Sequence, residues 1–219
     1  MTWNYAYTSH IWPSLLTVLL LVVLSTFAWH RRSVPGALPF MFGCLFATLW
    51  AAGSVMEYLA VDMAVKVFWA KFQGAWSMTL PTAIFCFVLE YAWPGRWLIR
   101  RNLILLSIPL FLALGLILTN DFYHLAWQGF EFDGSVKPRL GPGGWIAFVY
   151  AYVVVLANIV LLVWLFIRSQ YNRWSVIVML IGQFGGRTIF LLEKFEILHA
   201  ILPIEVVGMG FELGVFHLS

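Results

Sequence analysis

The segment from Met63 to Trp93, MAVKVFWAKFQGAWSMTLPTAIFCFVLEYAW, decides how the rest of the chain is arranged. At about 1.5 Å per residue, a helix of this length more than crosses a bilayer core of about 30 Å. Its first third carries Lys66, Lys71 and Gln73 among aromatic residues, and the remainder is apolar until Glu90. The pattern predicts a membrane span whose first end faces water, and the depth of every other segment is judged against it.

The composition places the chain in the membrane. Of its 219 residues, 62% are hydrophobic and 11% are charged, and the mean hydropathy is +0.88. Because so few charges could not cover the surface of a soluble domain, the sequence predicts an integral membrane protein with no room for a separate soluble catalytic domain. The pI near 9.0 and the net charge of +3 do not predict a nucleic-acid partner, because most basic residues fall in short turns between spans.

The apolar segments predict an all-α membrane protein, a seven-transmembrane helix bundle that forms a single domain over residues 1–219. No Lys or Arg precedes the first apolar run, and no small-residue cleavage site follows it, so the first span is expected to remain in the mature protein. The predicted spans are approximately 11–29, 38–60, 63–93, 102–118, 144–167, 174–192 and 200–218.

The longest connection, from Thr119 to about Gly143, lies between spans four and five. Within it, apolar and acidic residues alternate from Phe130 into an Asp133-Gly134 pair. Alternation that leads into Asp-Gly is typical of a tight turn between two strands. The sequence therefore predicts a short extracellular β-hairpin here.

Charged residues are divided unequally between the two sets of loops. One set carries seven arginines, and the other is mainly acidic. By the positive-inside rule the arginine-rich set is cytoplasmic, so we expect the N-terminus outside and the C-terminus inside, in the inner (plasma) membrane. The arginines are Arg31, Arg32, Arg96, Arg100, Arg101, Arg168 and Arg173, and the acidic residues are Asp62, Asp121, Glu131, Asp133, Glu193 and Glu196.

Polar and charged residues within the spans are expected to have a partner or a function. A charge at the bilayer centre costs on the order of 3 kcal/mol or more. Counting residues along each span gives every such group a depth, and groups at matching depth are candidate partners. These pairs either tie helices together or take part in function, and an arginine in an outer cavity could instead hold an anionic ligand. The predicted pairs are Arg187–Glu205, Gln183–Glu212 and Glu57–Lys71.

Aromatic residues in the outer half of the spans either pack in the core or line a ligand pocket together with Gln73. Because these residues share their depth with the charged groups, we expect a ligand to contact both kinds. The candidates for ligand contact are Glu57, Trp69, Gln73, Trp76, Arg187 and Glu205.

Glycines spaced four residues apart occur in spans six and seven. Small residues at this spacing let two helices approach closely. They indicate either tight packing of these two spans or a sliding contact that moves span seven. The candidates for helix pairing are Lys71, Gln183, Glu212, Gly182, Gly186, Gly210 and Gly214.

No cofactor is predicted. His10, His124 and His199 are all expected outside, where three imidazoles could bind zinc, but nothing in their spacing defines such a site. No phosphate loop, nucleophile motif or metal-binding helix motif is present, so the chain is not expected to be an enzyme. No lysine follows Lys194, which excludes a retinal Schiff base in the last span.

Several short motifs follow one another along nearly the whole chain. They are HRRSVPG at residues 30–36, VFWAKFQGAW at 67–76, FVLEYAWPGRWLIRR at 87–101 and LTNDFYHLAW at 118–127. In this order and spacing they resemble the N-terminal seven-transmembrane sensor region of bacterial histidine kinases. The residues that carry the resemblance are Arg32, Pro35, Gly36, Trp50, Glu57, Trp69, Pro81, Thr119, Asn120, His124, Gly144, Trp145, Tyr150, Tyr152, Pro203 and Ile204.

The start of span seven departs from the family pattern. Family members usually carry an aspartate shortly before the proline of span seven, and here no acidic residue lies between Glu196 and Pro203. The polar contact that the family makes at this position is therefore not expected in this chain.

The resemblance implies a sensor input domain. Such regions normally precede cytoplasmic PAS, histidine-kinase or diguanylate-cyclase modules, so the effector is expected outside the given sequence and the parent protein is expected to be a histidine kinase or a diguanylate cyclase. By analogy with kinases, we also expect a homodimer surrounded by membrane lipids.

We therefore expect a small extracellular or lipidic ligand to bind in the outer half, between spans two, three, six and seven, and span seven to transmit the signal to the effector. A second hypothesis is a small transporter with Arg187, Glu205 and Glu212 along a substrate or proton path, although the halves show no convincing repeat. A third hypothesis, a membrane-embedded enzyme, is disfavoured because the sequence has no clustered metal or nucleophile site. A fourth is a purely structural oligomerising module.

Overall fold

A computed structural model of the protein describes residues 3–8, 11–133, 135–168 and 173–182. Within these residues, five helices are long and apolar enough to cross a membrane. A shorter apolar helix, Arg173–Gly182, follows them. The five long helices are α1 (Trp12–His30), α2 (Ala37–Leu59), α3 (Met63–Ala92), α4 (Arg100–Leu118) and α6 (Pro142–Arg168).

The first five predicted spans are confirmed as helices. Each begins and ends within two residues of the boundaries that the sequence predicts. The predicted sixth span, 174–192, is described as far as Gly182 and is helical there. The predicted seventh span, 200–218, lies outside the described residues.

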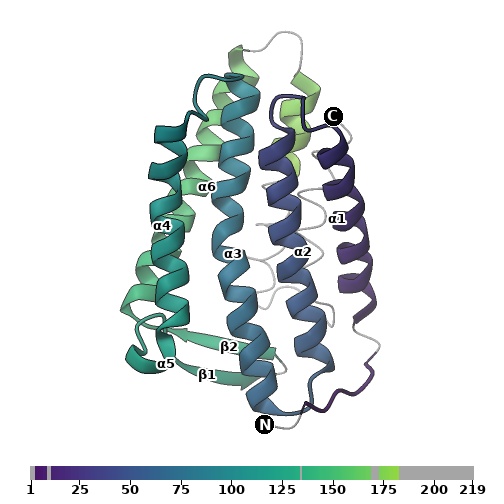
Figure 1. Ribbon diagram of the computed structural model, residues 1–219, viewed down its shortest axis with the longest axis vertical. Helices are drawn as coiled ribbons and strands as arrows, with labels where there is room; N and C mark the ends of the chain where they lie inside the picture. The colour runs from purple at the N-terminus through teal and green to yellow at the C-terminus, as the bar shows by residue number, and fades with distance from the viewer. Residues whose placement is uncertain (1–2, 9–10, 134, 169–172, 183–219) are drawn as a thin grey trace.

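The helices form two layers. α4, α3, α2 and α1 stand in a row, and α6 lies behind α3 and α4 (Figure 1). Buried apolar side chains from both layers meet between the helices and form the core. Its fully buried members include Leu21, Cys44, Ala47, Ala51, Val88, Leu162 and Val176.

Small residues on α2 allow this close packing. Gly43, Ala47 and Ala51 follow one another at intervals of four residues and are all buried. Small side chains at this spacing let neighbouring backbones approach closely, which is the main source of helix association where lipid replaces water. These residues form one small-residue stripe on α2, which packs against both α1 and α3.

The two ends of the bundle differ in chemistry. At one end, which we call the arginine end, α1 finishes before Arg31, α4 begins at Arg100 and α6 finishes at Arg168. The opposite end, which we call the hairpin end, carries the α2–α3 turn and the strands between α5 and α6 (Figure 1). The distribution of arginines predicted for the loops is therefore seen in the fold, and the cytoplasmic side of the arginine end remains a prediction.

A compact segment connects α4 to α6 at the hairpin end. The short helix α5 (Asn120–Tyr123) continues from α4. Strand β1 (Trp127–Asp133) then pairs antiparallel with β2 (Ser135–Leu140), with a shift in register between Trp127 and Gly129. These strands lie in the connection for which the sequence predicts a hairpin.

The N-terminal segment also closes this end. Tyr5 and Ala60 form an isolated antiparallel bridge. Its hydrogen bonds run from Ala6 N–H to the Leu59 carbonyl at 2.8 Å and from Val61 N–H to the Asn4 carbonyl at 3.0 Å. The segment before α1 is thereby tied to the turn between α2 and α3.

The start of α6 requires glycine because two backbones meet there. Gly141 N–H donates to the Ala126 carbonyl at 2.9 Å, and Gly143 N–H donates to the Leu125 carbonyl at 2.9 Å. A Cβ atom on Gly144 would lie only 2.2 Å from the Ala126 carbonyl oxygen. The absence of a side chain therefore fixes how the segment before β1 sits against α6.

We predict that Gly144→Ala lowers the midpoint of thermal unfolding, because the atom that the new methyl group meets belongs to the backbone and cannot rotate away. Overpacking of this kind typically costs about 1–3 kcal/mol. The matched control is Gly115→Ala in α4, where a Cβ meets nothing within 4 Å. That variant should leave the midpoint unchanged or raise it, since Ala favours a helix by about 1 kcal/mol over Gly. Equal midpoints for the two variants would contradict the close approach.

Candidate functional site

The candidate site is built around Glu57, in the last turn of α2 at the hairpin end. Its side chain is buried. Gln73 Nε2 of α3 donates to Glu57 Oε2 at 2.6 Å, and the Val136 N–H of β2 donates to Glu57 Oε1 at 3.0 Å. One carboxylate therefore joins α2, α3 and the strand pair.

Gly53 makes this contact possible. It precedes Glu57 by one helical turn on the same face of α2. A Cβ atom at Gly53 would lie 2.7 Å from Gln73 Cγ and 3.0 Å from Phe72 Cδ1. The missing side chain leaves the space through which Gln73 reaches the carboxylate.

Three of the predicted ligand contacts share one face of α3. Trp69, Gln73 and Trp76 are spaced four and three residues apart, which places them on neighbouring turns. Trp69 Nε1–H donates to the Tyr5 hydroxyl at 3.3 Å. Of the four predicted contacts that the structure describes, Glu57 and Gln73 are in direct contact, and Trp69 and Trp76 lie on the turns of α3 next to Gln73.

Trp76 lies among aromatic rings but leaves its polar atom unpaired. Its ring stacks on Phe46, with centroids 5.8 Å apart and an interplanar angle of 26°, and meets Phe72 edge to face at 5.8 Å. Its Nε1–H is buried and has no hydrogen-bond partner within the described part of the chain. A buried donor without a partner is costly, and such groups are often found where a ligand or water binds.

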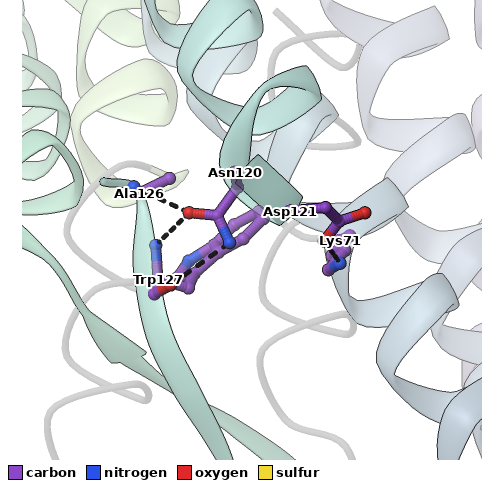
Figure 2. A network of polar contacts seen from close by, with 5 residues as sticks. All are labelled: Lys71, Asn120, Asp121, Ala126 and Trp127. Carbon is purple, nitrogen blue, oxygen red and sulfur yellow. Dashed lines mark hydrogen bonds and ion pairs between the residues drawn. The ribbon is translucent and has the colours of Figure 1, made fainter. Parts of the chain in front are cut away.

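The predicted pair Glu57–Lys71 is wrong. Lys71 Nζ instead forms an ion pair with Asp121 Oδ1 of α5, as Figure 2 shows. Side chains two residues apart on a helix point about 200° apart. Since Gln73 faces α2, Lys71 must face away from Glu57. Matching depths therefore identified two groups near the same level that lie on different faces.

Asn120 organises the segment between α5 and β1. Its Oδ1 accepts hydrogen bonds from Ala126 N–H at 2.9 Å and Trp127 N–H at 2.8 Å (Figure 2). Its Nδ2 donates to the Trp127 carbonyl at 3.2 Å. The side chain is buried, so these bonds replace water for three backbone groups. Asn120 thereby fixes where β1 begins.

Trp127 connects this segment to α3. Its ring is buried, with 3% of the residue exposed, and lies against Gly74, where a Cβ would be 2.6 Å from Trp127 Cζ2. A small apolar cluster surrounds it, made of Ile117, Ala126, Ala75, Met78, Leu116, Phe130 and Leu140. Strand β1 is therefore packed on α3 next to Gln73.

Two other predicted residues are described. Gly182 is buried at the end of its helix, and His124 is exposed, with a φ of 51° after α5. No group of three or more His, Cys, Asp or Glu residues that could hold a metal occurs in the described ranges. The remaining predicted site residues lie outside the described residues: His10, Gln183, Gly186, Arg187, His199, Glu205, Gly210, Glu212 and Gly214.

Sequence reasoning missed three parts of this site. Gly53 could have been found, because its spacing of four from Glu57 is the spacing that identified the glycines of spans six and seven. Asp121 could have been found as an acidic residue on the same side as Lys71. The role of Asn120 depends on the path of the backbone between α5 and β1, and no spacing reveals it.

A family model described as the N-terminal 7TM region of histidine kinase matches residues 13–211. The match includes α2, α3, α4 and the strand pair completely. No curated protein matches the chain.

Asn120→Ala is predicted to loosen the start of β1. It leaves the Ala126 and Trp127 amides without their acceptor, and each buried unpaired group typically costs about 1–3 kcal/mol. Hydrogen exchange at these two amides should become faster and the unfolding midpoint should fall. Asn102→Ala is the control, because within the described ranges Asn102 donates to the Trp97 carbonyl, at the arginine end and away from β1. Unchanged exchange at Ala126 and Trp127 in Asn120→Ala would show that Asn120 does not hold the segment.

A double-mutant cycle should distinguish the observed ion pair from the predicted one. Lys71→Gln and Asp121→Asn should be coupled by no more than about 1 kcal/mol in the free energy of unfolding, because pairs that reach solvent are weak. The side chains of Lys71 and Asp121 are 25% and 70% exposed. Lys71→Gln and Glu57→Gln should show a smaller coupling. A stronger coupling of Lys71 to Glu57 than to Asp121 would contradict the arrangement in the structure.

Proposed function

The chain belongs to the family of N-terminal seven-transmembrane regions of histidine kinases, and from this premise we propose that it binds a small-molecule ligand at its hairpin end and signals to a cytoplasmic effector. The family makes it a multi-pass membrane sensor region that is itself non-catalytic. The transporter hypothesis, with Arg187, Glu205 and Glu212 as its path, is not favoured by this assignment.

The observation that carries the proposal is the bridging position of Glu57. Both donors that contact its carboxylate among the described residues are neutral, the Gln73 amide and the Val136 N–H. A carboxylate has about four acceptor positions, so two remain for a ligand. A ligand group that donates hydrogen bonds or carries positive charge would complete the site in place of, or in addition to, these contacts.

The aromatic face of α3 supports the same location. Trp76 offers a buried Nε1–H without a described partner, and Trp69 offers a flat apolar surface near the N-terminal segment. Small-molecule sites typically combine apolar walls with a few polar groups. Glu57, Gln73 and the two tryptophans supply both. Arg187 and Glu205 remain ligand contacts predicted from the sequence alone, and the proposed site does not require them.

A ligand at Glu57 could alter the bundle because the residue holds three elements together. Displacing Gln73 or Val136 would shift α2 relative to α3 or release β2. A ligand that binds one arrangement better than another changes their populations. We propose that the last span, predicted at 200–218, carries this change to an effector domain in a homodimer in the inner membrane, with the arginine end cytoplasmic.

The test uses the full-length protein, including its effector, in lipid nanodiscs. Thermal unfolding is measured against a panel of small molecules, and effector activity is measured with any that raise the midpoint. A ligand that binds the native state raises the midpoint as its concentration exceeds Kd. Glu57→Gln should weaken this ligand at least about tenfold, or about 1.4 kcal/mol. Glu131→Gln should not, since Glu131 is an exposed partner of Arg139.

A second variant separates binding from folding. Trp76→Phe keeps an aromatic ring between Phe46 and Phe72 and removes an N–H that has no described partner. It should leave the unfolding midpoint without ligand unchanged while weakening the ligand. If Glu57→Gln and Trp76→Phe both respond like the wild type, the hairpin end is not the ligand site.

A further inference from the structure

A cavity of about 790 Å³ lies between α2, α3 and α4 at the arginine end. It extends from the α1–α2 and α3–α4 turns to Phe46 and Thr79, near the middle of the spans. Its volume is within the range of about 300–1,000 Å³ found for small-molecule sites. Neither Glu57 nor Gln73 lines it, and it adjoins the candidate site at Phe46, which lines the cavity and stacks on Trp76.

The shape of this inner cavity follows from the sizes of its side chains. Phe42 and Phe46 form one wall on successive turns of α2, and Leu103, Leu106 and Leu110 form the other on α4. The floor, on α3, is made of smaller residues that include Thr79, Thr82, Ala83 and Cys86. Tall apolar walls over a low floor leave a slot that suits an extended hydrocarbon chain.

The slot is open to surrounding lipid. Leu38, Phe42 and Leu103 line it and are 42%, 46% and 43% exposed. In a membrane span such apolar side chains face acyl chains rather than water. A molecule that already lies in the bilayer can therefore enter from the side.

Opposite charges lie at the end of the slot that is closest to the turns. Arg32 lines it from the α1–α2 turn, with its guanidinium carbon 4.8 Å from the Trp29 ring centroid. Glu90 lines it from α3 and accepts one hydrogen bond on Oε1, from Gly95 N–H at 2.9 Å. Glu90 Oε2 is buried without a partner among the described residues. The carboxylate thus retains unused acceptor capacity in a cavity that Arg32 also lines.

We propose that this cavity binds an aminophospholipid of the phosphatidylethanolamine type. One acyl chain lies in the slot, the phosphate pairs with Arg32, and the primary ammonium donates to Glu90. A choline headgroup has no N–H to donate, and a glycerol headgroup offers no positive charge to Glu90. The proposal goes beyond the sensing function and does not depend on a ligand at Glu57.

Recognition of the headgroup would distinguish a lipid bound in this cavity from the non-specific lipids that surround the bundle. Arg96, Arg100 and Arg101 lie at the same end and would attract any phosphate. A phosphate with an ammonium group pairs with Arg32 and also brings a positive charge to Glu90, whereas the hydroxyls of a glycerol headgroup could donate to Glu90 but carry no charge. Selectivity for ethanolamine over choline and glycerol headgroups is therefore the property to measure.

The experiment compares full-length protein with phosphatidylethanolamine, phosphatidylcholine and phosphatidylglycerol of identical acyl chains. Retained lipid is counted by native mass spectrometry, and the unfolding midpoint is followed at rising lipid concentration. The wild type should retain the ethanolamine lipid at least about tenfold more tightly than the choline lipid. Glu90→Gln keeps an acceptor for Gly95 and should lose this preference, whereas Glu131→Gln and Glu57→Gln should keep it.

A cavity-filling variant provides the second line of evidence. Leu106→Trp fills the slot from α4, whose outward surface faces lipid, and should reduce retention of the ethanolamine lipid without abolishing the fold. Equal retention of all three lipids would overturn the proposal, as would preference for the glycerol lipid or an ethanolamine preference that survives in Glu90→Gln. Because Glu57→Gln serves as a control here, failure of this proposal leaves the sensing function untouched, and the reverse also holds.

Discussion

A buried carboxylate in a membrane span must find hydrogen-bond donors, and the hairpin end of this protein is arranged around that requirement. Glu57 is 9% exposed, and an unsatisfied charge in such a position would cost several kcal/mol. Gln73 and the Val136 N–H satisfy it from two different elements. The contact therefore sets the rotation of α3 about its axis and the position of β2 at the same time.

The other contacts at this end follow from that rotation. With Gln73 turned toward α2, the next residue, Gly74, presents a bare backbone on which the Trp127 ring lies. Asn120 then holds the backbone of Trp127 in place. Lys71, on the opposite side of α3, meets Asp121 of α5. The strands are thus fixed to α3 through a buried ring and to α2 through a buried charge.

Sequence reasoning located the described helices well because apolar length is a one-dimensional property. The boundaries of α1 and α3 differ from the predicted spans by a single residue at most. The pairing of Glu57 failed because residue counting gives a height along the axis but no direction around it. The hydrogen bonds of Asn120 could not be predicted for another reason. Its partners are backbone groups whose positions are defined only after the chain has folded. To predict which side chains pair in a helix bundle, one needs both their height along the helix axis and the direction in which they point around it.

α3 relates the two proposed sites to each other. Gln73 lies at the hairpin end and Glu90 at the arginine end, about 25 Å apart along the helix. Pro81 lies between them, inside a helix that continues from Met63 to Ala92. Proline removes one backbone hydrogen bond, so bending of α3 is easiest near this point. A ligand that repositions Gln73 would move the first half of α3, whereas a lipid held by Glu90 would fix the second half against α2 and α4. Lipid at the arginine end would then determine how much of a movement at the hairpin end passes beyond Pro81.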